Sequence, residues 1–217
     1  MKTKTRPVEK EKLILVAGAN GYVGGKLAKA LSGYPYRVRC LVRDPQKLPQ
    51  AVLDNAEVVR GNVLEPNSVA VALEAVDTAF YLIHSMGGGG DFAERDRLAA
   101  NHFAQAARSV GVKRIIYLGG LGDQRLSPHL ASRQEVGRIL ANSGITTLEF
   151  RASIIIGVGS ISFEMIRTLV EKLPVMVTPR WIRTEAQPIA IEDVIGYLLE
   201  AIEVPLEKKL DLRDWRS

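Results

Sequence analysis

The stretch Leu13-Ile14-Leu15-Val16-Ala17-Gly18-Ala19-Asn20-Gly21-Tyr22-Val23-Gly24-Gly25-Lys26-Leu27 runs from an apolar strand through a glycine-spaced turn into a helix. Gly18, Gly21 and Gly24 follow the spacing G-x-x-G-x-x-G, which allows a tight exit from the strand, backbone approach to a pyrophosphate and close helix-to-strand packing. The helix that begins near Tyr22 directs its free N–H groups and positive dipole end at the phosphates. The stretch predicts a dinucleotide-binding turn, and a tight strand-to-helix turn without a ligand is the alternative.

Length and composition favour one α/β domain. The chain has 217 residues, of which 47% are hydrophobic and 6% aromatic, as in an aliphatic core with buried Val, Ile and Leu strands. We expect residues 1–12, which are rich in lysine and lack an apolar run, to form a flexible tail. Residues 13–217 then form a single domain. The net charge of +5 lies partly in that tail and is not interleaved with aromatic residues, so nucleic-acid binding is not indicated.

The single cysteine, Cys40, lies inside a predicted strand, which excludes a disulfide within the chain and favours the reducing cytoplasm. No apolar run approaches the roughly 18 to 20 residues that a membrane helix needs. The histidines lack metal-ligand spacing, and there is no cysteine cluster. We therefore expect a soluble, cytoplasmic protein without a membrane span, a nucleic-acid partner or a metal site.

Strands and helices alternate along the chain, which predicts a doubly wound parallel sheet with its ligands at the carboxyl ends of the strands. The predicted strands are 13–17, 37–42, 58–60, 78–83, 114–118 and a sixth made of 147–150 with 154–156. The predicted helices are 22–32, 66–76, 92–110, 129–143, 160–173 and 192–203. In the long helix, the helical spacing of Leu98, Ala99, Phe103, Ala106 and Ala107 predicts a core-facing side. Residues from about 157 to 203 are expected to form a small helical lid over the cleft.

Candidate cofactor contacts follow the ends of the first strands. Arg43, after the second strand, can pair with the 2′-phosphate of NADP or be a solvated charge, and the adjacent Asp44 keeps NAD open. Asn62 can donate and accept at an adenine edge or be a plain turn residue. His84 follows the fourth strand, where a nicotinamide ribose or substrate is expected. The predicted cofactor-binding residues are Gly18, Asn20, Gly21, Tyr22, Val23, Gly24, Arg43, Asn62, Val63, Leu82, Ile83, His84 and Arg133.

With these motifs the chain resembles the short-chain dehydrogenase/reductase superfamily, and within it the atypical branch of NmrA-like proteins and relatives of the 39 kDa subunit of respiratory complex I. The matching stretches are Gly18–Gly24, Leu41–Pro45, Gly61–Val63, Gly111–Leu118 and Gln187–Val194. The resemblance covers nearly the whole chain after residue 12 and implies a Rossmann-type, NAD(P)-binding fold. Some bacterial relatives continue into a further domain, so the chain is either a short form or part of a longer protein.

The resemblance also indicates altered catalytic machinery. Catalytic members have a serine after the fifth strand and a Tyr-x-x-x-Lys pair at the start of the next helix, with the tyrosine as proton donor. Here Gly119-Gly120 stands at the serine position and His129-Leu-Ala-Ser-Arg133 at the paired position. His129 can serve as an acid or base or can be a polar helix-start residue, and Arg133 lies on the same helical face but cannot relay a proton at ordinary pH.

Three functions are therefore considered. The first is an NADP(H)-dependent oxidoreductase for a carbonyl or quinone-like acceptor, with His129 and Arg133 as the candidate catalytic residues and water as an alternative proton source. The second is a non-catalytic redox sensor or assembly scaffold, in which bound NADP stabilises a conformation that a partner recognises. The third, a nucleotide-sugar epimerase, is weakened by the missing tyrosine. A small-molecule substrate, a protein partner and a homodimer through the helices beside the glycine-rich loop all stay open.

Overall fold

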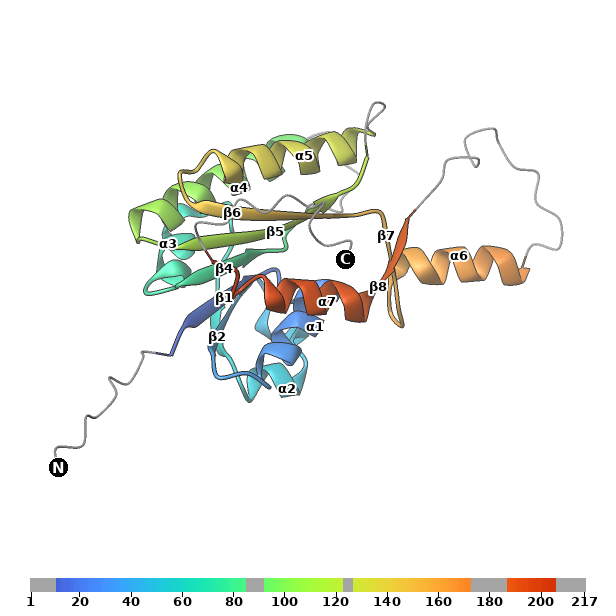
Figure 1. The fold of residues 1–217 in the computed structure, drawn as a ribbon, viewed down its shortest axis with the longest axis horizontal. Helices are drawn as coiled ribbons and strands as arrows, with labels where there is room; N and C mark the ends of the chain where they lie inside the picture. The colour runs from blue at the N-terminus through green and yellow to red at the C-terminus, as the bar shows by residue number, and fades with distance from the viewer. Residues whose placement is uncertain (1–10, 85–91, 123–126, 173–186, 206–217) are drawn as a thin grey trace.

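The protein is built around a parallel β-sheet covered by helices on both faces (Figure 1). The computed structural model describes residues 11–84, 92–122, 127–172 and 187–205. The main sheet has six strands in the order β3-β2-β1-β4-β5-β6, so the strand order reverses between β1 and β4. This arrangement confirms the predicted Rossmann-type, doubly wound fold, in which ligands bind at the point where the order reverses.

The strands of the main sheet agree closely with the predicted ranges. They are β1 (Leu13–Ala17), β2 (Arg37–Val42), β3 (Glu57–Arg60), β4 (Thr78–Tyr81), β5 (Arg114–Gly120) and β6 (Thr146–Ala152). All five residues of β1 are buried, because this central strand is covered by helices on both faces. Val16 is paired with Cys40 of β2 on one side and with Phe80 of β4 on the other. Cys40 is fully buried, as expected for a structural thiol.

One predicted strand is wrong in its extent. The sixth strand was expected to include residues 154–156, but the chain bends at Ser153 and leaves the main sheet. The next three residues form β7 (Ile154–Ile156), which pairs in parallel with β8 (Pro188–Ala190) in a separate two-stranded sheet. Ser153 alone separates the two segments, so the sequence contains no Gly or Pro turn signal between them. Proline is compatible with the first residue of a strand, which explains why Pro188 begins β8.

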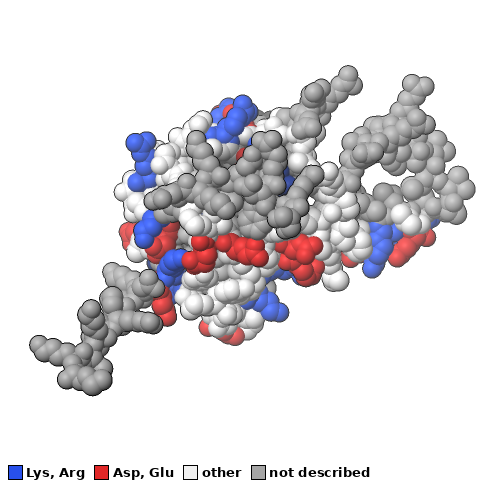
Figure 2. All heavy atoms as spheres, viewed as in Figure 1, with Lys and Arg blue, Asp and Glu red and all other residues white. Residues whose placement is uncertain are grey.

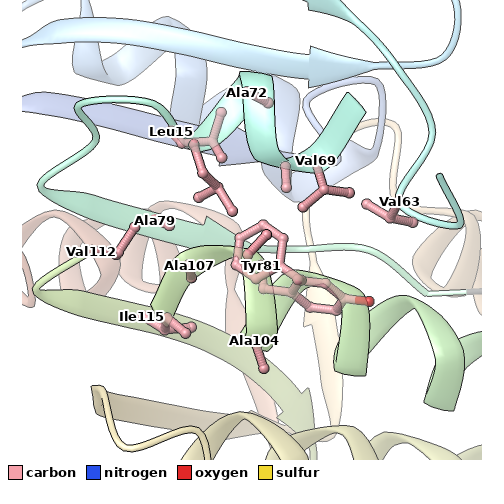
Figure 3. Close-up of a cluster of buried hydrophobic side chains, with 14 of the residues drawn as sticks. Leu15, Val63, Val69, Ala72, Ala79, Tyr81, Ala104, Ala107, Val112 and Ile115 are labelled. Carbon is pink, nitrogen blue, oxygen red and sulfur yellow. The ribbon is translucent and has the colours of Figure 1, made fainter. Parts of the chain in front are cut away.

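Most of the helices form a layer on each face of the main sheet. Their bounds are α1 (Tyr22–Leu31), η1 (Pro45–Lys47), α2 (Gln50–Leu53), α3 (Pro66–Leu73), α4 (Phe92–Ser109), α5 (Pro128–Ala141), α6 (Ile161–Lys172) and α7 (Ile191–Glu200). Helices α3, α4 and α5 cover one face and α1, α2 and α7 the other (Figure 1). In the first layer, Tyr81 of β4 packs edge-on against Phe103 of α4 in the cluster drawn in Figure 3.

The core-facing side of α4 differs from the predicted one at a single position. Ala99, Phe103, Ala106 and Ala107 are buried as expected, but Leu98 is 44% exposed. The helix instead buries Asp96, which lies one turn before Ala99 and Ala100. A carboxylate can take this place because Ser132 of α5 donates a hydrogen bond to it.

The C-terminal part of the described chain is helical and divides into two regions. Helix α7 packs on the main sheet, since Val194 and Leu198 belong to the same buried cluster as Leu27 of α1. Figure 2 shows a row of acidic side chains along its exposed face. Helix α6 extends away from the sheet beyond β7 and β8 (Figure 1). Of the predicted lid, 157–203, residues 173–186 lie outside the described residues, α6 and β8 lie off the main sheet, and closure over the cleft stays a prediction.

Candidate cofactor and active site

The glycine turn is closed tightly against the end of β4. Gly18 has φ +97°, a left-handed conformation that favours glycine, and a Cβ atom there would lie 2.7 Å from the Leu82 carbonyl oxygen and 3.1 Å from Ile83 Cγ1. A Cβ atom at Gly24 would lie only 2.2 Å from the Gly18 carbonyl oxygen. These contacts bring the predicted residues Gly18, Gly24, Leu82 and Ile83 together at the carboxyl edge of the sheet, where β1 and β4 meet.

The start of α1 keeps hydrogen-bond donors available for an anion. Its N-cap residue, Gly21, provides no capping side chain, and the first turn contains no acidic residue. The N–H groups at a helix start have no intrahelical acceptors, and they lie at the positive end of the helix dipole. The hydroxyl of Tyr22 lies beside Gly157, has no hydrogen-bond partner among the described residues, and has a pKa raised by burial and by Glu192. These features fit the pyrophosphate of a dinucleotide, with Tyr22, Val23 and Gly24 supplying backbone donors.

The end of β2 is linked to this turn. The Asn20 side-chain amide donates to the Asp44 backbone carbonyl at 2.9 Å. The Asp44 carboxylate accepts from the Gln46 N–H at 3.2 Å, which caps η1, and lies 3.7 Å from Lys47 Nζ. Arg43 is exposed and forms no ion pair with any residue in the described part of the chain. The aspartate is therefore committed to local structure, while the neighbouring arginine is available to a ligand.

Asn62 and Val63 have local roles in the segment after β3. The Asn62 N–H donates to Ser68 Oγ at 3.0 Å, and the Asn62 side-chain oxygen accepts from the Leu64 N–H at 3.1 Å. Val63 is part of the buried cluster in Figure 3, and its carbonyl lies 3.4 Å from His102 Nδ1. Asn62 thus acts as a turn residue, one of the two roles considered for it. Contact of Asn62 or Val63 with the adenine stays a prediction.

His84 and Arg133 share one region at the carboxyl edge, close to the ends of β4 and β5. His84 is exposed, and the pKa of its imidazole is lowered by the surrounding protein atoms and then by the positive charge of Arg133, while Asp96 acts in the opposite direction. The lowered pKa favours the neutral imidazole at neutral pH, a form with one donor and one acceptor nitrogen. Tyr117 Oη donates to the Arg133 backbone carbonyl at 2.8 Å, so the tyrosine holds the second turn of α5.

His129 occupies a different setting from His84. It is exposed in the first turn of α5, and its ring stacks on Phe92 of α4 with centroids 4.1 Å apart and an interplanar angle of 20°. The helix start itself is capped by Ser127, whose hydroxyl accepts from the Leu130 N–H at 3.3 Å. His129 is therefore accessible to solvent, and its catalytic role stays a prediction.

At the end of β5, the ends of two flexible side chains occupy the place of the serine side chain that catalytic relatives carry. A Cβ atom at Gly120 would lie 2.4 Å from Leu130 Cδ1, and one at Gly119 would lie 2.7 Å from Glu149 Oε1. Either substitution would require one of these side chains to move. The glycine pair is thus built into the packing between β5, β6 and α5.

Two polar pairs near the site were not predicted. The buried Ser132 hydroxyl donates to Asp96 Oδ2 at 2.9 Å, which joins α5 to α4. Glu149 accepts two hydrogen bonds from the Arg151 guanidinium, at 2.9 and 3.0 Å, beside Gly119. The sequence does indicate that Asp96 is buried and needs a partner, since it lies on the apolar side of a helix with Ala99, Ala100 and Phe103. It gives no such indication for the second pair.

Two further properties concern the described residues. No group of three or more His, Cys, Asp or Glu among them is arranged to hold a metal ion. None of the helices in the described ranges is long and apolar enough to cross a membrane.

Comparison with known proteins identifies the family and the fold of this chain. A family model described as NAD(P)H-binding matches residues 18–152. The chain is 30% identical over 114 residues to a 3 beta-hydroxysteroid dehydrogenase/Delta 5→4-isomerase of Mycobacterium tuberculosis, an alignment that covers 48% of this chain and 30% of that protein. The first curated relatives are matched over 30 to 38% of their own length, so the chain spans about a third of each.

Solved structures show the same fold. A short-chain dehydrogenase/reductase from Veillonella parvula aligns with a TM-score of 0.67 and 14% identity, over 90% of this chain and 88% of that one. The enzyme WbmH of Bordetella bronchiseptica in complex with NAD+ aligns with a TM-score of 0.73 and 16% identity, over 90% and 73% of the two chains. The predicted resemblance to short-chain dehydrogenases/reductases is confirmed at the level of the fold.

Proposed function

The chain belongs to the NAD(P)H-binding family, and from this premise we propose that it is an NADP(H)-dependent oxidoreductase that reduces a carbonyl or quinone-like acceptor. The proposal rests on one observation, that the glycine turn, His84 and Arg133 all lie at the carboxyl edge of the sheet. The glycine turn lies beside the end of β4, and His84 and Arg133 lie at the ends of the neighbouring strands. A cofactor bound across the reversal point would thus have polar groups beside its reacting end.

Different residues would bind the cofactor and transfer the proton. The turn from Gly18 to Gly24 would hold the pyrophosphate, and Leu82, Ile83 and His84 would line the nicotinamide end. When bound, NADPH supplies the hydride that a carbonyl carbon needs. The carbonyl oxygen also needs a proton, for which His129 and water are the candidates. Arg133 stays positively charged and would place a fixed cation beside the acceptor, but it does not donate the proton.

Arg43 supports NADP over NAD as the cofactor. Its guanidinium forms no ion pair within the described residues. In an NAD site the Asp44 carboxylate would accept a hydrogen bond from a ribose hydroxyl, but here it already caps η1. Replacing Arg43 by Ala should weaken NADPH binding by about 1.5 to 3 kcal/mol, the range of a charge-assisted contact, and leave NADH binding nearly unchanged. Parallel calorimetric titrations with the two nucleotides measure this difference. Equal losses for both would show that Arg43 does not contact the 2′-phosphate.

His129 is the second residue that substitution can test. If it donates the proton, His129→Ala should remove turnover while NADPH affinity stays within a few-fold, because the ring lies at α5 and not at the glycine turn. Phe92→Leu is a matched control, since it removes the stacked ring beneath His129 and keeps the imidazole. Steady-state rates and NADPH titrations on the same samples separate the two effects. An unchanged rate in His129→Ala would leave water as the proton source.

A non-catalytic sensor or scaffold is the second candidate function. The glycine pair at the end of β5 favours it, because Leu130 and Glu149 occupy the space that a catalytic serine would need. In that case NADP would stabilise one conformation for a partner, without turnover.

NADPH consumption in the presence of acceptors distinguishes the two functions. Purified protein is incubated with NADPH and a panel of quinones, aldehydes and ketones, and the absorbance of the reduced nicotinamide is followed. The oxidoreductase proposal predicts oxidation that depends on one class of acceptor. Tight NADPH binding with no oxidation across the panel would favour the sensor or scaffold.

A further inference from the structure

Arg133 lies over the carboxyl end of β5. A Cβ atom at Gly120 would stand 3.5 Å from Arg133 Cδ and 3.8 Å from its Nη1, so the aliphatic stem and guanidinium pass directly above this glycine. The backbone of Arg133 is held by Tyr117, and the preceding residue, Ser132, is hydrogen-bonded to Asp96. The guanidinium therefore projects from a fixed part of α5.

The charge of Arg133 has no partner in the described part of the chain. The residue is half-buried, its Nε is buried without a hydrogen bond, and no carboxylate there forms an ion pair with it. The half-exposed Arg97 and Arg151, by contrast, contact Glu135 at 2.6 Å and Glu149 at 2.9 Å. A partly buried, unpaired cation is costly unless a ligand neutralises it.

Among the charged groups near His84 and Tyr117, Arg133 has the largest effect on the pKa of each, ahead of the carboxylates Asp96 and Glu149. Burial raises the pKa of Tyr117 and Arg133 lowers it, so the guanidinium lies close enough to act on that ring as well as on His84. His84 is shifted toward its neutral form and does not compete for an anion as a second cation. Asp96, the acid that acts on both groups, accepts a hydrogen bond from Ser132. The phosphates of a dinucleotide would bind at the start of α1, which follows β1, whereas Arg133 lies over the end of β5, and β4 lies between these two strands.

We propose that Arg133 binds a carboxylate of the acceptor, so that the substrate is a carbonyl compound bearing a carboxylate group. This inference rests on the proposed oxidoreductase function. A guanidinium presents paired N–H donors that match the two oxygens of a carboxylate, which fixes the orientation of the substrate as well as its charge. The acceptor carbonyl would then lie between Arg133 and the nicotinamide end of the site.

A matched pair of aldehydes tests the proposal through turnover. The probes are 4-carboxybenzaldehyde and its methyl ester, which differ in the charge of one group. The wild-type protein with NADPH should reduce the acid with a kcat/KM about 10- to 100-fold higher than the ester, and Arg133→Gln should abolish this preference. Arg138→Gln, on the exposed side of the same helix, is the matched control and should retain it. Equal kcat/KM values for acid and ester in the wild type would overturn the proposal.

A second readout does not depend on turnover. Calorimetric titration with benzoate and benzamide should show benzoate binding to the wild type and to Arg138→Gln, and loss of that binding in Arg133→Gln. Melting temperatures of the same samples establish that the variants are folded. If Arg133→Gln loses NADPH affinity and keeps benzoate binding, the arginine serves the cofactor and the proposal is wrong. If benzoate binding depends on Arg133 but no aldehyde or quinone is reduced, the anion site stands and the oxidoreductase function fails.

Discussion

Gly24→Ala is expected to abolish measurable NADPH binding. The added Cβ would stand 2.2 Å from the Gly18 carbonyl oxygen and 2.8 Å from its carbonyl carbon, both backbone atoms that cannot rotate away. The turn must therefore open, which moves the N–H groups at the start of α1 out of reach of the phosphates. Loss of two charge-assisted hydrogen bonds at about 1.5 to 3 kcal/mol each lowers affinity by about 100-fold or more. Calorimetric titration of NADPH measures the loss.

Gly196→Ala is the matched control for this substitution. Gly196 lies inside α7, and a Cβ atom there would meet no atom within 4 Å. Alanine should stabilise the helix by about 1 kcal/mol and leave NADPH affinity unchanged. Thermal unfolding of both variants shows whether Gly24→Ala is folded at the titration temperature, since overpacking costs about 1 to 3 kcal/mol. Wild-type affinity in a folded Gly24→Ala protein would refute the role assigned to the turn.

Arg114→Met is expected to lower the free energy of unfolding by about 3 to 5 kcal/mol, because it leaves buried carbonyl groups without donors. Arg114 is 4% exposed at the start of β5. Its guanidinium donates to the carbonyl of Ala201 at 2.7 Å and also to those of Ile202 and Val204. These bonds attach the end of α7 to the sheet. Methionine matches the stem but provides no donor, and chemical denaturation measures the difference.

Arg37→Met supplies the comparison for Arg114. Arg37 is exposed at the start of β2, the same edge of the main sheet. Its substitution should change the free energy of unfolding by no more than about 0.5 kcal/mol, as for most surface positions. If Arg114→Met is as stable as Arg37→Met, α7 is held by its apolar contacts with α1 and not by the buried arginine.

Much of the fold was predictable because the sequence patterns are strong and local. The apolar run of β1 and the spacing of Gly18, Gly21 and Gly24 fixed the first strand, turn and helix within one residue. The separation of β6 from β7 was not predictable, since the chain bends at the single residue Ser153 with no Gly or Pro between the two strands. The partner of the buried Asp96 was likewise not predictable, because Ser132 is distant in sequence.

The sequence predicted the residues at the glycine turn of the candidate site, but it predicted only part of the arrangement around His84, His129 and Arg133. Resemblance identified Arg133 and the missing serine, but it could not reveal that Arg133 lacks an ion-pair partner in the described residues. That property depends on every element that surrounds the guanidinium. Similarly, the commitment of the Asp44 carboxylate to η1 became visible only in the structure, and it strengthens the case for NADP.

The most direct test of cofactor binding is a parallel calorimetric titration of cofactor-stripped protein with NADPH and NADH. We predict one NADPH per chain, bound more tightly than NADH, because the glycine turn supplies the phosphate donors and Arg43 the contact to the 2′-phosphate. If neither NADPH nor NADH binds, the central claim is wrong, because every function considered for this chain depends on that turn.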